Sequence, residues 1–245
     1  MSEASTARKL QLDGVHNIRD LGGLLRDDRR TTRRGRAYRA CGMDGLSAAG
    51  EAALLRTGVG HVIDLRSPAE IAAIPGPFHT HPGRREVSLF EGLAPLAQCL
   101  RQAPQAGLAN RYILALKQAP AQFARVFRLI AQPGDRPVLF HCTAGKDRTG
   151  LIAALLLALN QVEYEQIVQD YAATATLGAD LLARLRARAL LRGDEPALVE
   201  QALRSDAATM AQVLTWIDSH HGSVAGYLSA TGLDADSLDR LARML

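Results

Sequence analysis

Ten consecutive residues of this chain combine the side chains that nucleophilic chemistry on an anion requires. Residues 141–150 read His-Cys-Thr-Ala-Gly-Lys-Asp-Arg-Thr-Gly, so Arg148 follows Cys142 by six positions. If this loop opens a helix, its unpaired backbone N–H groups and the positive end of the helix dipole favour a bound anion. In that field we expect Cys142 to be a thiolate nucleophile, while the planar guanidinium of Arg148 can bind two phosphoryl oxygens. The segment therefore predicts a phosphate-binding loop with a nucleophile at its base.

The remaining loop residues extend this prediction. We expect them to bind the phosphate through backbone and side chains: Thr143, Ala144, Gly145, Lys146 and Thr149. The hydroxyl of Thr149 can also donate a hydrogen bond to the cysteine sulfur and help it to leave. Lys146 is one of three lysines among 29 basic residues. Its ammonium could favour substrates that carry more than one phosphate, or it could simply neutralise Asp147.

The flanking segments must position this loop. Residues 137–140 are a short apolar run with β-forming side chains and predict a buried strand, and residues 151–159 are apolar on every side, as in a central buried helix. The other predicted elements before the loop are a strand pair at 12–42, a helix at 46–57, a strand at 61–64, a helix at 68–73, a strand at 86–89 and a helix at 122–131. This alternation predicts an α/β fold with a central, parallel-rich sheet flanked by helices.

The Cys-x5-Arg-Thr-Gly pattern resembles the active-site loop of cysteine-dependent protein tyrosine phosphatases. The fuller string from Cys142 to Gly150 is similar to that of their atypical bacterial branch, the PtpB-like tyrosine/serine phosphatases. Further segments that resemble this family follow in its order along nearly the whole chain: 17–23, 34–39, 62–67, Asp170-Tyr171 and 222–228. The resemblance implies hydrolysis of phosphotyrosine, with phosphoserine or phosphothreonine and phosphoinositides as further substrates, the last associated with Lys146. It implies no metal and no organic cofactor.

Other interpretations of the cysteine loop fit less well. The first glycine of a Walker A loop would fall on Phe140, and Asp147 stands where that motif needs a hydroxyl residue. Sulfur transfer of the rhodanese type also uses a cysteine in an anion loop, but the Arg-Thr-Gly ending matches phosphatases better. A phosphate-recognition module with little turnover stays open as the alternative function. We expect Cys41 and Cys99 to be small apolar side chains and not nucleophiles.

A cysteine phosphatase also needs an acid to protonate the leaving oxygen, and three carboxylates are candidates. Asp64 comes first because it ends an apolar strand, where α/β folds place active-site groups, and because the resemblance favours the Asp of Asp-Leu-Arg-Ser. The structural alternative for Asp64 is an ion pair with Arg66. Asp147 within the loop comes second, and Glu91 comes third.

The composition fits one enzyme domain over residues 1–245, of which 1–11 are expected to be flexible. The chain is 47% hydrophobic, enough for an aliphatic core. No apolar run approaches the roughly 20 residues that span a bilayer, and residues 1–9 lack the apolar region of a signal peptide. Three cysteines without paired spacing suit a reducing, cytoplasmic location, and secretion without a cleavable signal stays open.

The net charge of +4 is concentrated in part between Arg26 and Arg39, around Asp27-Asp28. We expect an exposed hairpin there, or else a basic rim that attracts phosphorylated substrates or an anionic membrane surface. Nucleic acid is not an expected partner, since only Tyr38 could stack on a base. The expected partners are a phosphorylated protein or a phosphoinositide, and the sequence does not predict the oligomeric state. His220-His221 has no further ligand at metal-binding spacing, so no metal site is predicted.

Residues 93–119 are helical in character but interrupted by Pro95, Pro104 and Gly107. One hypothesis is a helical lid over the site, which the resemblance also implies and which would gate substrate entry. The alternative is ordinary packing on the sheet. After Asn160 the chain is expected to be almost entirely helical, at 164–173, 180–192, 196–203, 207–219 and 237–245.

Overall fold

Short runs of β-forming residues build a five-stranded sheet at the centre of the protein. The structure is a computed structural model that describes residues 8–102, 107–132, 134 and 136–245. The strand order is β1-β2-β5-β3-β4, and only the β1–β2 pair is antiparallel. The strands are β1 (Arg19–Asp20), β2 (Ala37–Ala40), β3 (His61–Asp64), β4 (Arg84–Glu86) and β5 (Val138–His141). The predicted parallel-rich sheet flanked by helices is confirmed. The segment predicted to be flexible, 1–11, falls in part on residues 1–7, outside the described residues.

Alternation of side chains along the strands divides the core between the two faces of the sheet. In β5, Val138 and Phe140 belong to the larger group of buried apolar residues, and Leu139 belongs to the smaller one. The same division separates Ile63 from Val62 in β3. Because both faces are covered, consecutive residues of β5 and β3 are apolar, Val138 to Phe140 and Val62 with Ile63.

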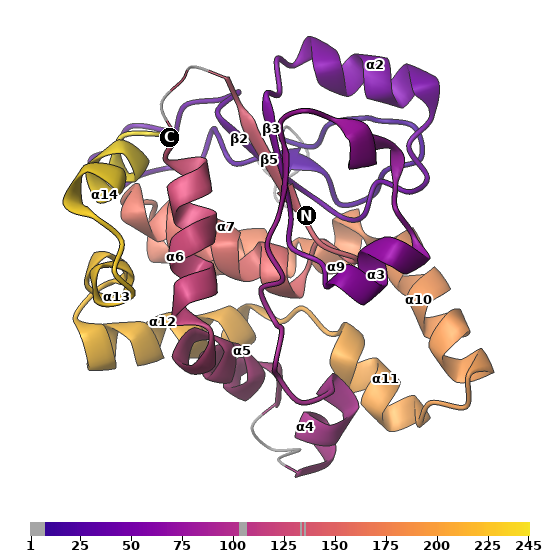
Figure 1. The fold of residues 1–245 in the computed structure, drawn as a ribbon. Coiled ribbons are helices and arrows are strands. Elements are labelled where there is room, and N and C mark those ends of the chain that lie inside the picture. The colour runs from indigo at the N-terminus through magenta and orange to yellow at the C-terminus, as the bar shows by residue number, and fades with distance from the viewer. Residues whose placement is uncertain (1–7, 103–106, 133, 135) are drawn as a thin grey trace.

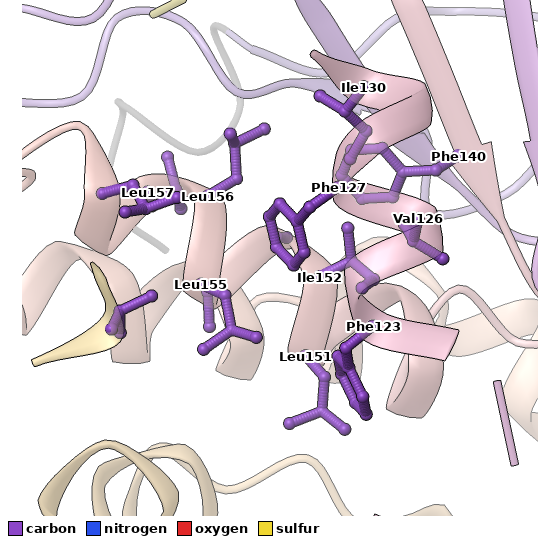
Figure 2. Packing of buried hydrophobic residues seen from close by; sticks show 14 of the residues in the cluster. Phe123, Val126, Phe127, Ile130, Phe140, Leu151, Ile152, Leu155, Leu156 and Leu157 are labelled. Carbon is purple, nitrogen blue, oxygen red and sulfur yellow. The ribbon is translucent and has the colours of Figure 1, made fainter. Parts of the chain in front are cut away.

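The buried helix predicted after the loop is α7 (Asp147–Leu159), and it begins four residues earlier than the apolar run. Figure 2 shows its side chains packed with those of α6 (Pro120–Ile130), among them Phe123 and Phe127. A helix that is apolar on every side is stable in water only when it is covered all round. Burial of each leucine contributes about 1.5–3 kcal/mol, so α7 is a rigid base for the loop that precedes it.

The other helices lie around the sheet and below it in the view of Figure 1. They are α2 (Ala48–Arg56), α3 (Pro68–Ala73), α4 (Leu96–Gln102), α5 (Gly107–Gln118), α8 (Tyr164–Ala172), α9 (Thr174–Leu177), α10 (Ala179–Leu191), α11 (Pro196–Leu203), α12 (Ala207–His221), α13 (Val224–Ala230), α14 (Ala235–Ala242) and the 3-10 helix η1 (Pro77–Thr80). The predicted C-terminal helices are present, and α9 and α13 are additional. The strand predicted at 86–89 lies instead at 84–86. No helix in the described part of the chain is long and apolar enough to cross a membrane.

The segment considered as a lid divides into two helices with different surroundings. α5 is part of the core, since Leu108, Tyr112 and Leu116 are buried. α4 lies beside α11 at the lower edge of the view in Figure 1. Residues 107–118 thus pack against other helices, among them α12, residues 103–106 lie outside the described residues, and a lid over 93–119 stays a prediction.

The arginine-rich segment 26–39 forms a small hairpin, but its arginines do not share one exposed rim. Leu25 and Thr31 make an antiparallel bridge around a turn in which Arg29 has φ +66°. The guanidinium of Arg26 donates to the carbonyl of Leu245, and Arg39 is completely buried. Arg39 supports the loop after β5 instead of facing solvent.

Candidate active site

The loop from Cys142 to Lys146 joins β5 to α7, and its backbone carbonyls are bound from behind. The side-chain amide of Asn17 donates to the carbonyls of Ala144 and Gly145, both at 3.1 Å, and Arg39 Nη2 donates to Gly145 O at 2.8 Å. Since these carbonyls point away from the site, the loop N–H groups are left for an anion in front of them. Gly145 has φ +65°, and a Cβ there would lie 2.5 Å from the backbone oxygen of Ala40. This position therefore requires glycine.

A buried charged cluster of Arg8, Arg19, Arg39 and Asp170 stands behind the loop. The register of β1 and β2 places Arg19 beside Arg39, and both reach Asp170, at 2.9 Å and 2.6 Å. Arg8 completes the group at 2.8 Å. Burial raises the pKa of Asp170, but the three arginines outweigh it and hold that pKa far below its usual range.

Three guanidiniums around one carboxylate leave an excess of positive charge behind the loop. Burial, with the repulsion of Arg39, lowers the pKa of Arg19 to about 9, which still leaves it protonated at neutral pH. Cys142 is itself buried, with 1% of its surface exposed, and Arg39 of this cluster donates to the carbonyl of Gly145 in the loop that follows it. A nearby excess of positive charge favours a phosphate dianion bound in the loop.

Arg148 is held in place by Glu70 of α3. Nη1 and Nη2 of Arg148 donate to the two carboxylate oxygens at 2.6 Å and 2.8 Å, and Thr143 Oγ1 donates to the same carboxylate at 2.6 Å. Glu70 also closes a capping box with Ser67, which fixes its position at the start of α3. Burial raises the pKa of Glu70, yet Arg148 and Thr143 together lower it to about 2. The carboxylate thus orients the guanidinium at every ordinary pH.

Asp147 lies at the first position of α7 and is a quarter exposed. Its Oδ1 accepts a hydrogen bond from the hydroxyl of Tyr112 at 2.6 Å and another from Lys146 Nζ at 2.8 Å. Tyr112 comes from α5 and is in turn 2.9 Å from the hydroxyl of Tyr171. Burial raises the pKa of Asp147, but the ammonium of Lys146 and the Tyr112 hydroxyl lower it by more than burial raises it. The pKa of Asp147 therefore lies below its usual value in the free protein.

Lys146 does not point into the mouth of the site. Its side chain is 1% exposed, and Nζ donates to Asp147 and to the backbone carbonyl of Arg204 at 3.0 Å. Burial lowers the pKa of Lys146, and the adjacent Asp147 raises it by more, so the ammonium stays charged. Of the two predicted roles, this geometry favours neutralisation of Asp147 over contact with a second phosphate.

Asp64 lies at the carboxyl end of β3, as the sequence predicts, but it is buried in ion pairs. Its carboxylate is 2.7 Å from Arg66 and 2.8 Å from Arg84, and none of its surface is exposed. Burial raises the pKa of Asp64, but Arg66, His141 and Arg84 hold it well below its usual range. A carboxyl that never binds a proton at ordinary pH is a poor proton donor, so this geometry argues against Asp64 as the first choice for the acid. Glu91, the third candidate, is exposed.

Two buried polar atoms near the nucleophile have no hydrogen-bond partner within the described residues. One is Oγ1 of Thr149 and the other is Nδ1 of His141. The Thr149 hydroxyl is the group expected to donate to the cysteine sulfur, and an unpartnered buried hydroxyl is costly unless such a role or a ligand satisfies it. Burial lowers the pKa of His141 to about 4, so its imidazole is neutral at pH 7.

The mouth of the site is a cavity of about 320 Å³ in front of Arg148. Its walls are formed by Ser67, Glu70, Ser88, Phe90, Leu96, Arg111, Asp147 and Arg148. No group of three His, Cys, Asp or Glu side chains that could hold a metal ion occurs among the residues described. The arrangement can therefore bind a phosphate against the loop and place a carboxyl, Asp147, beside the group that leaves.

Sequence reasoning missed the residues that hold this site together: Asn17, Arg19, Arg39, Glu70, Tyr112 and Asp170. Three of their segments carried the family resemblance, but nothing in the residue types indicated a role. Arginines are usually exposed, and only the strand register shows that Arg19 and Arg39 face the same buried carboxylate.

Comparisons with known proteins find similarity to tyrosine phosphatases. A model of a tyrosine phosphatase family matches residues 10–245. A Cupriavidus necator protein that is named a tyrosine-protein phosphatase is 32% identical over 225 residues, which cover 89% of this chain and 82% of that protein. The triple specificity protein phosphatase PtpB of Mycobacterium tuberculosis is 29% identical over an alignment of 282 residues, covering 96% of this chain and 98% of PtpB. The solved structure of P. aeruginosa TpbA aligns at 19% identity with a TM-score of 0.40, over 82% of this chain and 98% of that chain.

Proposed function

The chain belongs to the tyrosine phosphatase family whose model it matches, and we propose that it hydrolyses phosphotyrosine through a cysteinyl-phosphate on Cys142. The observation that carries this proposal is the loop itself. Its carbonyls are bound from behind by Asn17 and Arg39, so its N–H groups face the position of a phosphate in front of a buried cysteine. Arg148, oriented by Glu70, binds the same phosphate from the side.

In the first step the Cys142 sulfur forms a bond to phosphorus as the bond from phosphorus to the tyrosine oxygen breaks. The leaving oxygen takes a proton, and we assign this proton to Asp147. Both donors that hold Asp147 in the described structure reach Oδ1, which leaves Oδ2 to carry the proton. A bound phosphate dianion beside the carboxyl would raise its pKa from the low value of the free protein, so that the acid form is populated when substrate is present.

In the second step a water oxygen attacks phosphorus while the sulfur–phosphorus bond breaks. Asp147, now a carboxylate, takes a proton from this water and returns to its starting form. The Thr149 hydroxyl donates a hydrogen bond to the sulfur that leaves, and the positive charge of the cluster behind the loop stabilises the negative charge that the sulfur takes up. Arg148 and the loop N–H groups hold the three non-bridging oxygens in both steps, and such preorganised donors supply a large share of the rate.

The range of substrates is a further part of the proposal. The name of PtpB says that this relative has triple specificity, which supports testing phosphoserine, phosphothreonine and phosphoinositides beside phosphotyrosine. The buried position of Lys146 gives no separate support for phosphoinositides. We also propose a cytoplasmic location, which the three free cysteines support.

The test is phosphate release by the wild type, Cys142→Ser and Cys99→Ser, with EDTA present. Cys99 is partly exposed and lies outside the loop, so Cys99→Ser is the matched control. We expect turnover of a phosphotyrosine peptide to survive EDTA, to vanish in Cys142→Ser and to persist in the control. Tight binding of inorganic phosphate without turnover of any substrate would instead favour the phosphate-recognition module.

A further inference from the structure

Two arginines line the mouth of the site, and they have different partners. Arg148 pairs with Glu70, and the other carboxylate in the wall, Asp147, pairs with Lys146. Arg111 of α5 donates instead to the backbone carbonyl of Ala94 and to the sulfur of Cys99. Within the described part of the chain, Arg111 has no carboxylate partner. Its positive charge is therefore uncompensated at the entrance.

Phe90 fixes the spacing of these two cations. The guanidinium carbon of Arg111 lies 5.5 Å from the centroid of the Phe90 ring, and that of Arg148 lies 5.9 Å from the same centroid. The two charges therefore cannot be further apart than the sum of these distances. Phe90 also packs against Tyr112, with ring centroids 6.5 Å apart, and cation–π contacts hold a guanidinium over such a ring. Arg111 is thus a positioned charge in the same cavity wall as Arg148.

Building on the proposed function, we propose that Arg111 binds a carboxylate next to the phosphotyrosine of a peptide substrate. A phosphate held by Arg148 leaves the tyrosine ring in the mouth, beside Phe90. Side chains one or two residues along the peptide then lie at the entrance to the mouth, whose wall includes Arg111. This makes Arg111 a specificity-determining residue.

The experiment compares kcat/KM for two phosphotyrosine peptides that differ only in having Glu or Gln next to the phosphotyrosine. At low ionic strength we expect the wild type to prefer the Glu peptide by about threefold to fivefold, as for a partly exposed charge pair. Arg111→Ala should bring this ratio close to one, and Arg111→Lys should keep most of it. Arg125→Ala is the matched control, because Arg125 is exposed on α6 and does not line the mouth. The preference of the wild type should shrink at high salt.

Arg111→Gln serves as a second variant if Arg111→Ala does not fold, since glutamine keeps part of the aliphatic stem over Phe90. A ratio near one in the wild type, or one that persists in Arg111→Ala and Arg111→Gln, would overturn the inference and leave the proposed function standing. If the variants lose turnover only of a phosphoinositide with a second phosphate, the recognised anion belongs to a lipid and the peptide inference is wrong. No turnover of either peptide by the wild type would overturn the proposed function as well.

Discussion

Asp170→Asn should destabilise the whole protein and loosen the phosphate loop, although Asp170 makes no contact with substrate in the proposed mechanism. The substitution keeps the shape of the side chain but removes the one negative charge among Arg8, Arg19 and Arg39. The carboxylate now accepts from these arginines at 2.8 Å, 2.9 Å and 2.6 Å. Its loss would leave three buried guanidiniums with no anion in the cluster. Arg39 would also lose the partner that orients it toward the carbonyl of Gly145.

The magnitude follows from burial. Removal of one partner from a buried ion pair costs about 3–5 kcal/mol, chiefly because the remaining charge is left uncompensated. Here three charges are left, so we expect the upper part of that range. A typical domain has only about 5–15 kcal/mol of stability, and for a chain of this length the loss corresponds to a fall in melting temperature on the order of 10 °C.

Urea unfolding of the wild type, Asp170→Asn and Asp239→Asn would measure this effect. Asp239 also pairs with an arginine, Arg243 at 2.8 Å, but both side chains are largely exposed, and its removal should cost less than about 0.5 kcal/mol. Arg8→Met should be less harmful in the Asp170→Asn background than in the wild type, because it then removes an uncompensated charge. If Asp170→Asn costs no more than Asp239→Asn, the buried charged cluster does not stabilise the loop and the reasoning is refuted.

Three further predictions concern the acid, the phosphate and the response to pH. Asp147→Asn should lower kcat by about 10²–10⁴-fold, and the loss should be smallest for aryl phosphates with good leaving groups. Asp64→Asn should lose the same factor for every aryl phosphate and should melt at a lower temperature. The reverse pattern would restore Asp64 as the acid. Glu70→Gln should weaken competitive inhibition by inorganic phosphate by roughly tenfold through a misplaced Arg148, and unchanged inhibition would contradict that role. Burial lowers the pKa of His141 to about 4, against 6.5 for an exposed imidazole. Between these two pH values the unfolded chain binds a proton that the folded protein does not. The free energy of unfolding should therefore fall by about 3 kcal/mol from pH 6.5 to 4. In His141→Gln the unfolding free energy should depend less on pH over that interval, and an unchanged dependence would refute the assignment.

The sequence predicts those parts of the site that are contiguous along the chain. Cys142, Asp147 and Arg148 lie within seven residues, so their types and spacing suffice to indicate a phosphate loop between a strand and a helix. Glu70 and Tyr112 come from α3 and α5, and only the packing of those helices brings them to the loop. The alternation of strands and helices likewise predicts the sheet, but not its order or the length of β1.

The choice of acid shows why residue type and strand position are insufficient. Asp64 stands at the carboxyl end of a parallel strand, where catalytic groups are common, and this supported its first rank. Arg84 argues against it, and Arg84 comes from β4, the neighbouring parallel strand. Two guanidiniums around one carboxylate hold its pKa lower than one arginine two residues away would. The second arginine is visible only in the folded protein.

An acid in the loop itself changes what the enzyme must do to reach its reactive form. Where the acid lies on a separate mobile segment, that segment has to close before the leaving group can be protonated. Here Asp147 begins α7, one residue before Arg148, and Tyr112 and Lys146 fix its carboxyl from a buried helix and from the loop. In the proposed mechanism the nucleophile, the phosphate-binding arginine and the acid therefore belong to one unit, built on a helix that is covered all round. If Asp147 is the acid, no closure is needed to place it, and the proposed selectivity depends on the walls of the mouth, which include Phe90 and Arg111.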